Sequence, residues 1–167
     1  MRGIPALAAA LLAAIASPAT AADDIVDERE VFAAVDAFLA AIGSDDRTEL
    51  ARHMIPEGTI FVHNRMEPEN PRVDIVSVAD HLERWRSLTG DFEERMDAYD
   101  TTISYGMAQV TGGYSFSVDG EVSHCGVNAL SLARMDDGTW KVGNVSFTMV
   151  PPDQCRFVGA NWVPGAQ

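Results

Sequence analysis

Apolar positions early in the chain recur with the period of an α-helix. In DEREVFAAVDAFLAAIG, residues 27–43, they fall at i, i+1, i+4, i+7, i+8 and i+11, which places them in one stripe along a helix. Acidic residues occupy the first turn and Gly43 closes the segment, as is usual at helix ends. The pattern predicts a helix that buries one face, formed by Val31, Phe32, Val35, Phe38, Leu39 and Ile42.

A second, shorter helix is predicted directly after the first. Asp46 and Glu49 form a cap-like D-x-x-E pattern at its start. Leu50 and Met54 are spaced to face inward together, and Pro56 ends the helical pattern.

A third helix is predicted over residues 77–88. Ser77 is a candidate N-cap, with Asp80 three residues further on. His81 precedes Trp85 by four residues, so the two side chains would lie side by side on the helix. The predicted buried face consists of Val78, Leu82 and Trp85.

From Phe92 onward the apolar period changes to two, which is the period of a β-strand. One earlier strand is predicted in TIFVH, and the polar segment with two prolines that follows it is predicted to be a loop, residues 64–74. The strands are predicted at residues 59–63, 92–100, 101–118, 121–134 and 139–150.

Two glycine-containing pairs shape the predicted strands. Asp119-Gly120 is a strong signal for a two-residue hairpin turn. Gly112-Gly113 indicates a bulge or a sharp bend. Three helices with one strand among them, followed by a four-stranded antiparallel meander, predict an α+β fold. A strongly bent sheet of this kind would fold over the helices and leave a cone-shaped cavity.

The N-terminus has the pattern of a secretory signal peptide, predicted over residues 1–21. A positive residue precedes the apolar run IPALAAALLAAI, and Ala19 and Ala21 form an A-x-A cleavage pattern. The alternative is a membrane anchor, but the run is shorter than the roughly 20 residues that a spanning helix needs. We therefore expect a periplasmic or secreted protein whose remainder, residues 22–167, is a single domain with a core at 27–150 and a tail at 151–167.

Charge and cysteine content narrow the choice of partners. The net charge is −13, which argues against nucleic acid and against an anionic membrane surface as partners. The chain has two cysteines, Cys125 and Cys155, and an oxidising compartment permits a disulfide between them. The alternative is that the two thiols never meet. No Cys or His spacing typical of a metal site occurs, and we expect no cofactor.

Several stretches resemble one superfamily. They are AIGSDDRTELARHM with the following TIFV, then YSFSVDGEVSHCGVNALSLAR, and then DGTWKVGNVSFT, in which Trp140 and Lys141 follow a DG turn. From Asp27 to about Val150, this order resembles the nuclear transport factor 2-like (NTF2-like) superfamily and its SnoaL-like branch. The SHCGVN stretch is similar to small exported bacterial members of unassigned activity. The resemblance implies a curved sheet wrapped on three helices around a cone-shaped pocket. It leaves the activity open, because such proteins include isomerases, dehydratases, epoxide hydrolases and binding proteins.

The strand pattern brings a carboxylate onto an apolar face. Glu94 shares a strand face with Phe92 and Met96, and a buried carboxylate of this kind is suited to acid/base chemistry. The alternative is an ion pair with an arginine or an exposed edge position. His63 shares a face with Thr59 and is a second candidate, although a strand-end histidine in solvent fits the same pattern.

A two-residue turn at Asp119-Gly120 would pair three residues of one strand with three of the next. The predicted pairs are Phe116 with Ser123, Ser115 with His124, and Tyr114 with Cys125. His124 and Asn128 would then share one face, and Cys125 would lie on the other face with the aromatic residues. A Cys-His nucleophilic pair is therefore not expected. Which face lines the cavity is left open by the sequence.

Two functions follow from these candidates. The first is binding of a small, largely hydrophobic molecule, and the second is an acid/base enzyme, an isomerase, dehydratase or hydrolase, with Glu94 and His124 as catalytic residues and Tyr105 or Tyr114 as further candidates. The resemblance also implies a homodimer formed through the open face of the sheet, which is compatible with either function. The candidate ligand-binding residues are His63, Trp85, Glu94, Tyr114, His124 and Asn128.

Overall fold

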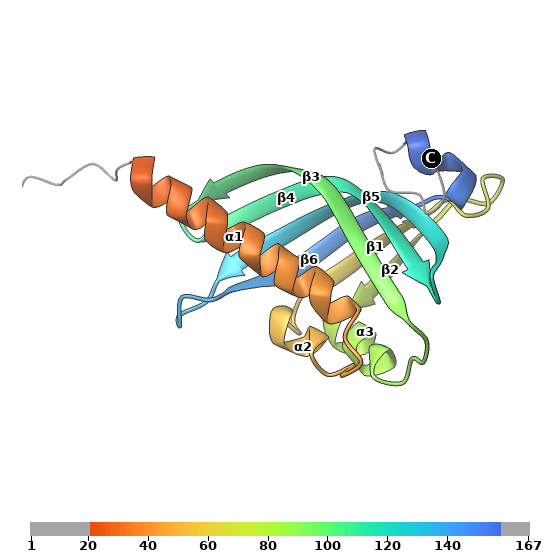
Figure 1. Ribbon diagram of the computed structural model, residues 1–167, viewed down its shortest axis with the longest axis horizontal. Helices are drawn as coiled ribbons and strands as arrows, with labels where there is room; N and C mark the ends of the chain where they lie inside the picture. Colours follow the sequence, from red (N-terminus) through yellow and green to blue (C-terminus); the bar gives the residue numbers. More distant parts are fainter. Residues whose placement is uncertain (1–20, 158–167) are drawn as a thin grey trace, which may run out of the picture.

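The computed structural model describes residues 21–157, apart from the side chains of residues 21–27, 98–99 and 157 (Figure 1). The predicted signal peptide, except for Ala21, lies outside the described residues, as does Trp162 of the predicted tail. Within this part of the chain, no helix is long and apolar enough to cross a membrane.

The described residues form a six-stranded sheet, three α-helices and one 3-10 helix. The sheet order is β2-β1-β6-β5-β4-β3, with neighbours antiparallel except for the parallel pair β1 and β6. The elements are α1 (Ala21–Ile42), α2 (Leu50–His53), β1 (Thr59–Asn64), β2 (Arg72–Ser77), α3 (Val78–Trp85), β3 (Phe92–Ser104), β4 (Met107–Val118), β5 (Glu121–Arg134), β6 (Trp140–Met149) and η1 (Pro152–Phe157).

The sheet is strongly curved, and the helices lie on its concave side. Helix α1 runs along this side, and α2 and α3 lie at one end of it (Figure 1). The main hydrophobic core fills the space between α1 and the sheet, and Val31 and Val35 of α1 are fully buried in it. The architecture is therefore the predicted α+β cone.

The three predicted helices are present, but the predicted cap of the second is not, because Glu49 is the N-cap of α2 and its side chain makes no capping hydrogen bond. The Ser77 hydroxyl accepts a hydrogen bond from the Asp80 backbone N–H at 3.0 Å, so Ser77 caps α3. Leu50 at the start of α2 and Met54 directly after it are buried, and Val78, Leu82 and Trp85 are buried on α3.

The segment after β1 was predicted to be a loop, but its last residues belong to strand β2. Residues 72–77 pair antiparallel with β1 and form one edge of the sheet. The sequence of β2 does not show the apolar alternation of a half-buried strand, because its apolar Val73 and Ile75 point away from the core and are 49% and 68% exposed.

The boundary predicted between residues 100 and 101 is also wrong. The chain turns at Tyr105-Gly106, which join β3 to β4 with positive φ angles of 47° and 80°. A tyrosine is unusual in this left-handed region, so the sequence carried a weak turn signal there. The irregularity predicted at Gly112-Gly113 lies instead in the partner strand, where β3 places residues 98 and 99 opposite Gly112.

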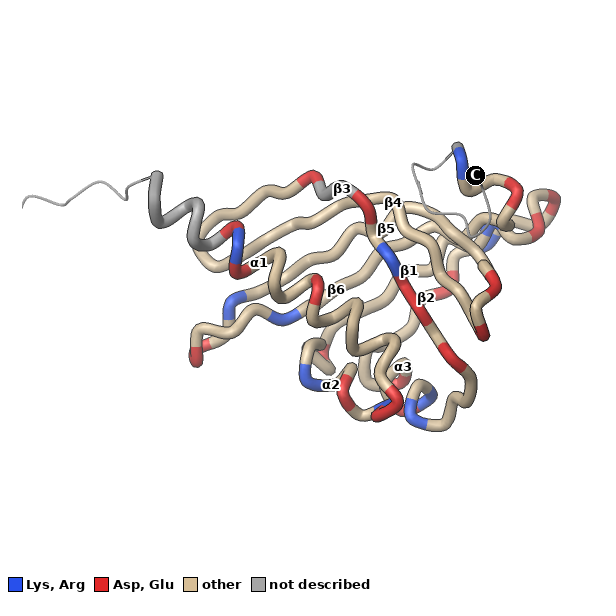
Figure 2. Tube along the Cα trace, viewed as in Figure 1, with Lys and Arg blue, Asp and Glu red and all other residues tan. Residues whose placement is uncertain are grey.

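Charged residues lie mainly on loops, at helix ends and along β3 (Figure 2). Glu93 and Arg95 on β3 form an ion pair at 2.7 Å on the face opposite to the core. The concave side of the sheet is consequently lined mainly by apolar side chains, and the polar groups on it are few enough to consider one by one.

Candidate functional site

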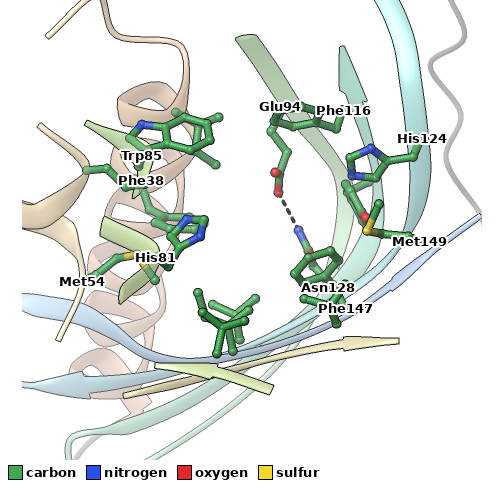
Figure 3. Close-up of a pocket in the computed structure, with 17 residues that line it drawn as sticks. Phe38, Met54, His81, Trp85, Glu94, Phe116, His124, Asn128, Phe147 and Met149 are labelled. Carbon is green, nitrogen blue, oxygen red and sulfur yellow. Dashed lines mark hydrogen bonds between the residues drawn. The ribbon is translucent and has the colours of Figure 1, made fainter. Parts of the chain in front are cut away.

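A cavity of about 210 Å³ lies between the helices and the concave face of the sheet. Figure 3 shows Trp85 and His81 on one side and Glu94, Asn128 and His124 on the other. Its lining consists of Phe38, Ile42, Leu50, Met54, Ile60, Val62, Val76, His81, Trp85, Glu94, Tyr114, Phe116, His124, Asn128, Val145, Phe147 and Met149.

The register of β4 and β5 decides which residues of the hairpin reach this cavity. The turn at Asp119-Gly120 is the predicted two-residue turn, with φ angles of 52° and 82°. Ser123 is an extra residue in β5, however, because Phe116 pairs with His124 while Ser117 pairs with Val122.

Because of this bulge, all three cross-strand pairs predicted between β4 and β5 are wrong. Phe116 faces His124, Ser115 faces Cys125 and Tyr114 faces Gly126, one residue away from the prediction. His124 therefore shares the cavity face with Tyr114 and Phe116. Cys125 lies on the opposite face, so the predicted separation of His124 from Cys125 is confirmed.

Glu94 is the carboxyl group of the cavity lining. Its Oε1 accepts a hydrogen bond from Asn128 Nδ2 at 2.7 Å (Figure 3). Burial among apolar side chains raises the pKa of Glu94 to about 7, although the Asn128 hydrogen bond acts in the opposite direction. Near neutral pH this carboxyl group is therefore divided between its protonated and ionised forms.

His124 is held between two aromatic rings. It stacks on Phe116 with ring centroids 5.0 Å apart and meets Tyr114 edge-on at 5.8 Å. Its Nδ1 lies 3.2 Å from the Ser123 hydroxyl oxygen. Burial lowers the pKa of His124 to about 4, so the ring is neutral at pH 7.

Tyr114 lines the cavity with its ring, while its hydroxyl group is engaged with the backbone. The hydroxyl donates a hydrogen bond to the Thr148 carbonyl oxygen at 2.9 Å. Burial, together with the nearby Glu94 carboxylate, raises the pKa of Tyr114 far above its ordinary value. Tyr114 is therefore a neutral wall residue that fixes the end of β6.

His81 lines the cavity from α3 and was not among the predicted site residues. Its ring stacks on Trp85 with centroids 5.8 Å apart, and burial lowers its pKa. The spacing of four residues to Trp85 placed the two side chains together in the sequence pattern. What the sequence did not show is that this edge of the helix faces the sheet.

Of the six predicted ligand-binding residues, the cavity brings together Trp85, Glu94, Tyr114, His124 and Asn128. His63 does not belong to it. Ile60 and Val62 of β1 face the cavity, so His63 points to the outer face, where its Nε2 lies 3.1 Å from the Ser146 hydroxyl oxygen.

Tyr105, a further tyrosine candidate, also lies away from the cavity. It is fully exposed in the β3–β4 turn. The described residues contain no group of His, Cys, Asp or Glu side chains arranged to hold a metal ion.

A disulfide joins Cys125 of β5 to Cys155 of η1, with the two Cα atoms 5.5 Å apart. It lies behind the strand that carries His124 and forms a small second core with Val150. Next to it, Gly126 lets the Thr148 backbone approach so closely that a Cβ at position 126 would lie 1.9 Å from the Thr148 carbonyl oxygen. The disulfide and this close approach together fix the wall that bears His124 and Met149.

No protein-family model and no curated protein matches the chain. Solved structures do match its fold. A protein from Streptomyces avermitilis described as a "putative dehydratase from the NTF2-like family" is 18% identical, with a TM-score of 0.60 over 76% of this chain and 98% of that chain. An NTF2-like protein of unknown function from Shewanella baltica is 11% identical, with a TM-score of 0.54 over 76% of this chain and 96% of that one.

A third neighbour is the β subunit of a "putative aromatic-ring-hydroxylating dioxygenase" from Novosphingobium aromaticivorans, 13% identical, with a TM-score of 0.61 over 77% of this chain and 92% of that chain. At these identities the likeness concerns the fold alone. The chain has the NTF2-like fold, as the sequence resemblance implied, and its activity has to be argued from its own cavity.

Proposed function

We propose that this protein is exported and binds a small, largely apolar molecule in the cavity between α3 and the concave face of the sheet. The observation that carries the proposal is the cavity of about 210 Å³, lined mainly by aromatic and aliphatic side chains around the hydrogen-bonded pair of Glu94 and Asn128. An apolar cavity of about 150 Å³ holds benzene, so this one has room for a one- or two-ring molecule. A few converging polar groups in an apolar cavity are typical of small-molecule sites.

Export is proposed from the N-terminal pattern, and the disulfide is consistent with it. Disulfides persist in oxidising compartments such as the periplasm. Detection of the mature chain in the periplasmic or extracellular fraction, with an N-terminus near Ala22, tests this part. We also propose a homodimer through the open face of the sheet, which light scattering on the mature protein tests.

Indole, a neutral two-ring molecule, is a suitable probe for the binding proposal. We expect isothermal titration calorimetry to show saturable binding to the wild-type protein and loss of binding in Val62→Trp, whose larger side chain fills the cavity. Val73→Trp is the matched control, because Val73 lies on the neighbouring strand and faces outward. Equal indole binding by the two variants, or none by the wild type, would contradict the proposal.

Acid/base catalysis is the second candidate, favoured by one observation. Glu94 has a pKa of about 7 and reaches the cavity, so it can accept or donate a proton at neutral pH. The "putative dehydratase" among the structural neighbours is compatible with this chemistry. The two carboxyl oxygens have different surroundings, because Asn128 holds Oε1 and leaves Oε2 to a substrate.

The ketone 2-tetralone in D₂O tests the second candidate, because a base near its α-carbon exchanges hydrogen for deuterium. The wild-type rate should rise with pH through about 7, as Glu94 ionises, and should fall by two orders of magnitude or more in Glu94→Gln. Exchange at the buffer rate with bound 2-tetralone would leave binding as the function.

A further inference from the structure

The polar groups of the cavity point to one chemical class of ligand. Building on the proposed binding function, we infer that the molecule bound here carries a basic nitrogen, which is protonated in the complex and donates its N–H groups to Glu94. The inference uses the charge, the hydrogen-bond polarity and the aromatic surroundings of the cavity.

Charge is the first step. Glu94 is the one carboxyl group among the lining residues, and none of the lining residues is a lysine or an arginine. An anionic ligand would meet a like charge with nothing to offset it, whereas a cation would be paired. The net charge of −13 over the whole chain also attracts cations over longer range.

Hydrogen-bond polarity is the second step. The hydroxyl group of Tyr114 is already donating to Thr148, and the Asn128 amide is donating to Glu94 Oε1. The hydrogen bond that the Glu94 carboxyl group makes to Asn128 uses Oε1 and not Oε2. His81 and His124, both neutral at pH 7, each carry one N–H donor and one acceptor nitrogen, so they favour neither donors nor acceptors in a ligand. The ionised carboxylate of Glu94 can only accept, and an ammonium group supplies donors alone.

The aromatic surroundings are the third step. Glu94 and Phe116 are cross-strand partners, so their side chains are neighbours on the cavity face. The Phe116 ring stacks on His124 at 5.0 Å, and Phe147 meets Tyr114 edge-on at 6.0 Å. A cation paired with Glu94 would therefore lie within reach of an aromatic face, which adds a cation–π attraction to the ion pair.

The titratable groups that face Glu94 are His81 from α3, Tyr114 from β4 and His124 from β5, while α1 contributes only Phe38 and Ile42 to the lining. Because none of the three is cationic at pH 7, an ammonium ligand would supply the counter-charge that the described lining residues lack. Its binding would shift Glu94 fully to the carboxylate. Near pH 6, where Glu94 is mostly protonated, binding should therefore release a proton.

Three probes of matched shape separate the charge types: 2-phenylethylamine, 2-phenylethanol and phenylacetate. At pH 8 we expect calorimetry to show that the amine binds at least tenfold more tightly than the alcohol and that phenylacetate does not bind. At pH 6, titrations of the amine in buffers of different ionisation enthalpy should report the release of close to one proton. This second measurement uses the wild-type protein and does not depend on any variant folding.

Glu94→Gln should remove the preference, so that the amine binds no more tightly than 2-phenylethanol. Glu93→Gln is the matched control, because Glu93 is the adjacent carboxylate and points to the outer face, where it pairs with Arg95. Binding of the alcohol as tightly as the amine, survival of the preference in Glu94→Gln, or no proton release at pH 6 would overturn the inference. If indole binds and the amine does not, the inference fails while the binding function stands. If indole and all three probes fail to bind, both fail.

Discussion

Glu94 on β3 is hydrogen bonded to Asn128 on β5 across the intervening strand β4. Adjacent strands lie about 4.8 Å apart, so side chains two strands apart ordinarily do not meet. Here the concave curvature tilts the two side chains together. Gly112, which faces Asn128 on β4, has no side chain to stand between them. The contact joins two walls of the cavity and favours the ionised form of its carboxyl group against the larger effect of burial.

Removal of the Asn128 side chain should make Glu94 a weaker acid. Because the amide N–H stabilises the carboxylate form, Asn128→Ala should raise the pKa of Glu94 from about 7 by about one further unit. NMR titration of the ¹³C-labelled Glu94 carboxyl group measures this directly.

Asn144→Ala is the matched control for this titration. Asn144 lies on β6, is exposed, and accepts a hydrogen bond from the Thr59 backbone N–H at 2.9 Å. It should leave the pKa of Glu94 in place. A lower Glu94 pKa in Asn128→Ala would mean that the amide does not stabilise the carboxylate.

Glu94 and His124 should have opposite effects on the pH dependence of stability. Glu94 has a folded pKa of about 7 against an ordinary pKa of 4.5, so between these values the folded state binds more protons and the free energy of unfolding falls as pH rises. For His124 the folded pKa of about 4 lies below the ordinary 6.5, so its contribution rises with pH between 4 and 6.5. Between pH 4.5 and 6.5 both groups contribute, and their opposite effects on the free energy of unfolding largely cancel.

Single substitutions should reveal each slope. Urea unfolding of Glu94→Gln should show stability that rises between pH 4 and 6.5, and His124→Gln should show stability that falls between pH 4.5 and 7. The full amplitude of each is about 3 kcal/mol. Glu93→Gln, at an exposed position, should reproduce the wild-type profile. Parallel profiles for Glu94→Gln and the wild type would show that Glu94 titrates normally in the folded protein.

The sequence predicted the elements of this fold better than the geometry of the site. Helix stripes and strand alternation are local signals, and they located α1, α3 and β5 correctly. Strand β2 was missed, because its outward-facing Val73 and Ile75 do not follow the alternation of a half-buried strand.

The alternation of side chains along β3 identified Glu94 as a candidate site residue, because it places a carboxylate between Phe92 and Met96 on an apolar face. The partners of His124 could not be predicted in the same way. One bulged residue, Ser123, shifts the whole pairing of β4 with β5, and nothing local in the sequence marks it. The face of β1 that lines the cavity also depends on how the sheet curves, which is why His63 was expected there and Val62 is found.

The disulfide should contribute substantially to stability. It closes a loop of 30 residues, for which the loop-entropy model gives about 3–4 kcal/mol. The double variant Cys125→Ser/Cys155→Ser should lose about this much in urea unfolding.

Comparison with the reduced wild-type protein separates the cross-link from the change of side chain. Reductant present throughout unfolding and refolding should lower the stability of the wild type and leave the double variant unchanged. If oxidised and reduced wild type unfold at the same urea concentration, the cross-link does not stabilise the fold.

Gly126 should be the least replaceable position in the wall that carries His124. A Cβ there would lie 1.9 Å from the Thr148 carbonyl oxygen and 2.6 Å from Thr148 Oγ1. Both atoms hold the strands together, since the carbonyl oxygen accepts from the Tyr114 hydroxyl and Oγ1 accepts from the Val127 N–H. Gly126→Ala must displace β6 backbone, so we expect a loss of about 3 kcal/mol in unfolding free energy, at the upper end of overpacking costs.

Gly143→Ala, on β6, provides the control for Gly126→Ala. Its added Cβ would meet only the flexible end of Ile55 at 3.5 Å and a carbonyl oxygen at 3.6 Å, which are ordinary contacts. We expect its stability to stay within about 0.5 kcal/mol of the wild type. Because the Thr148 shift also moves Met149 at the cavity, Gly126→Ala should weaken indole binding and Gly143→Ala should not. Equal unfolding free energies for the two variants would show that β6 yields at Thr148 without cost, and that this wall of the cavity is not fixed by the close approach.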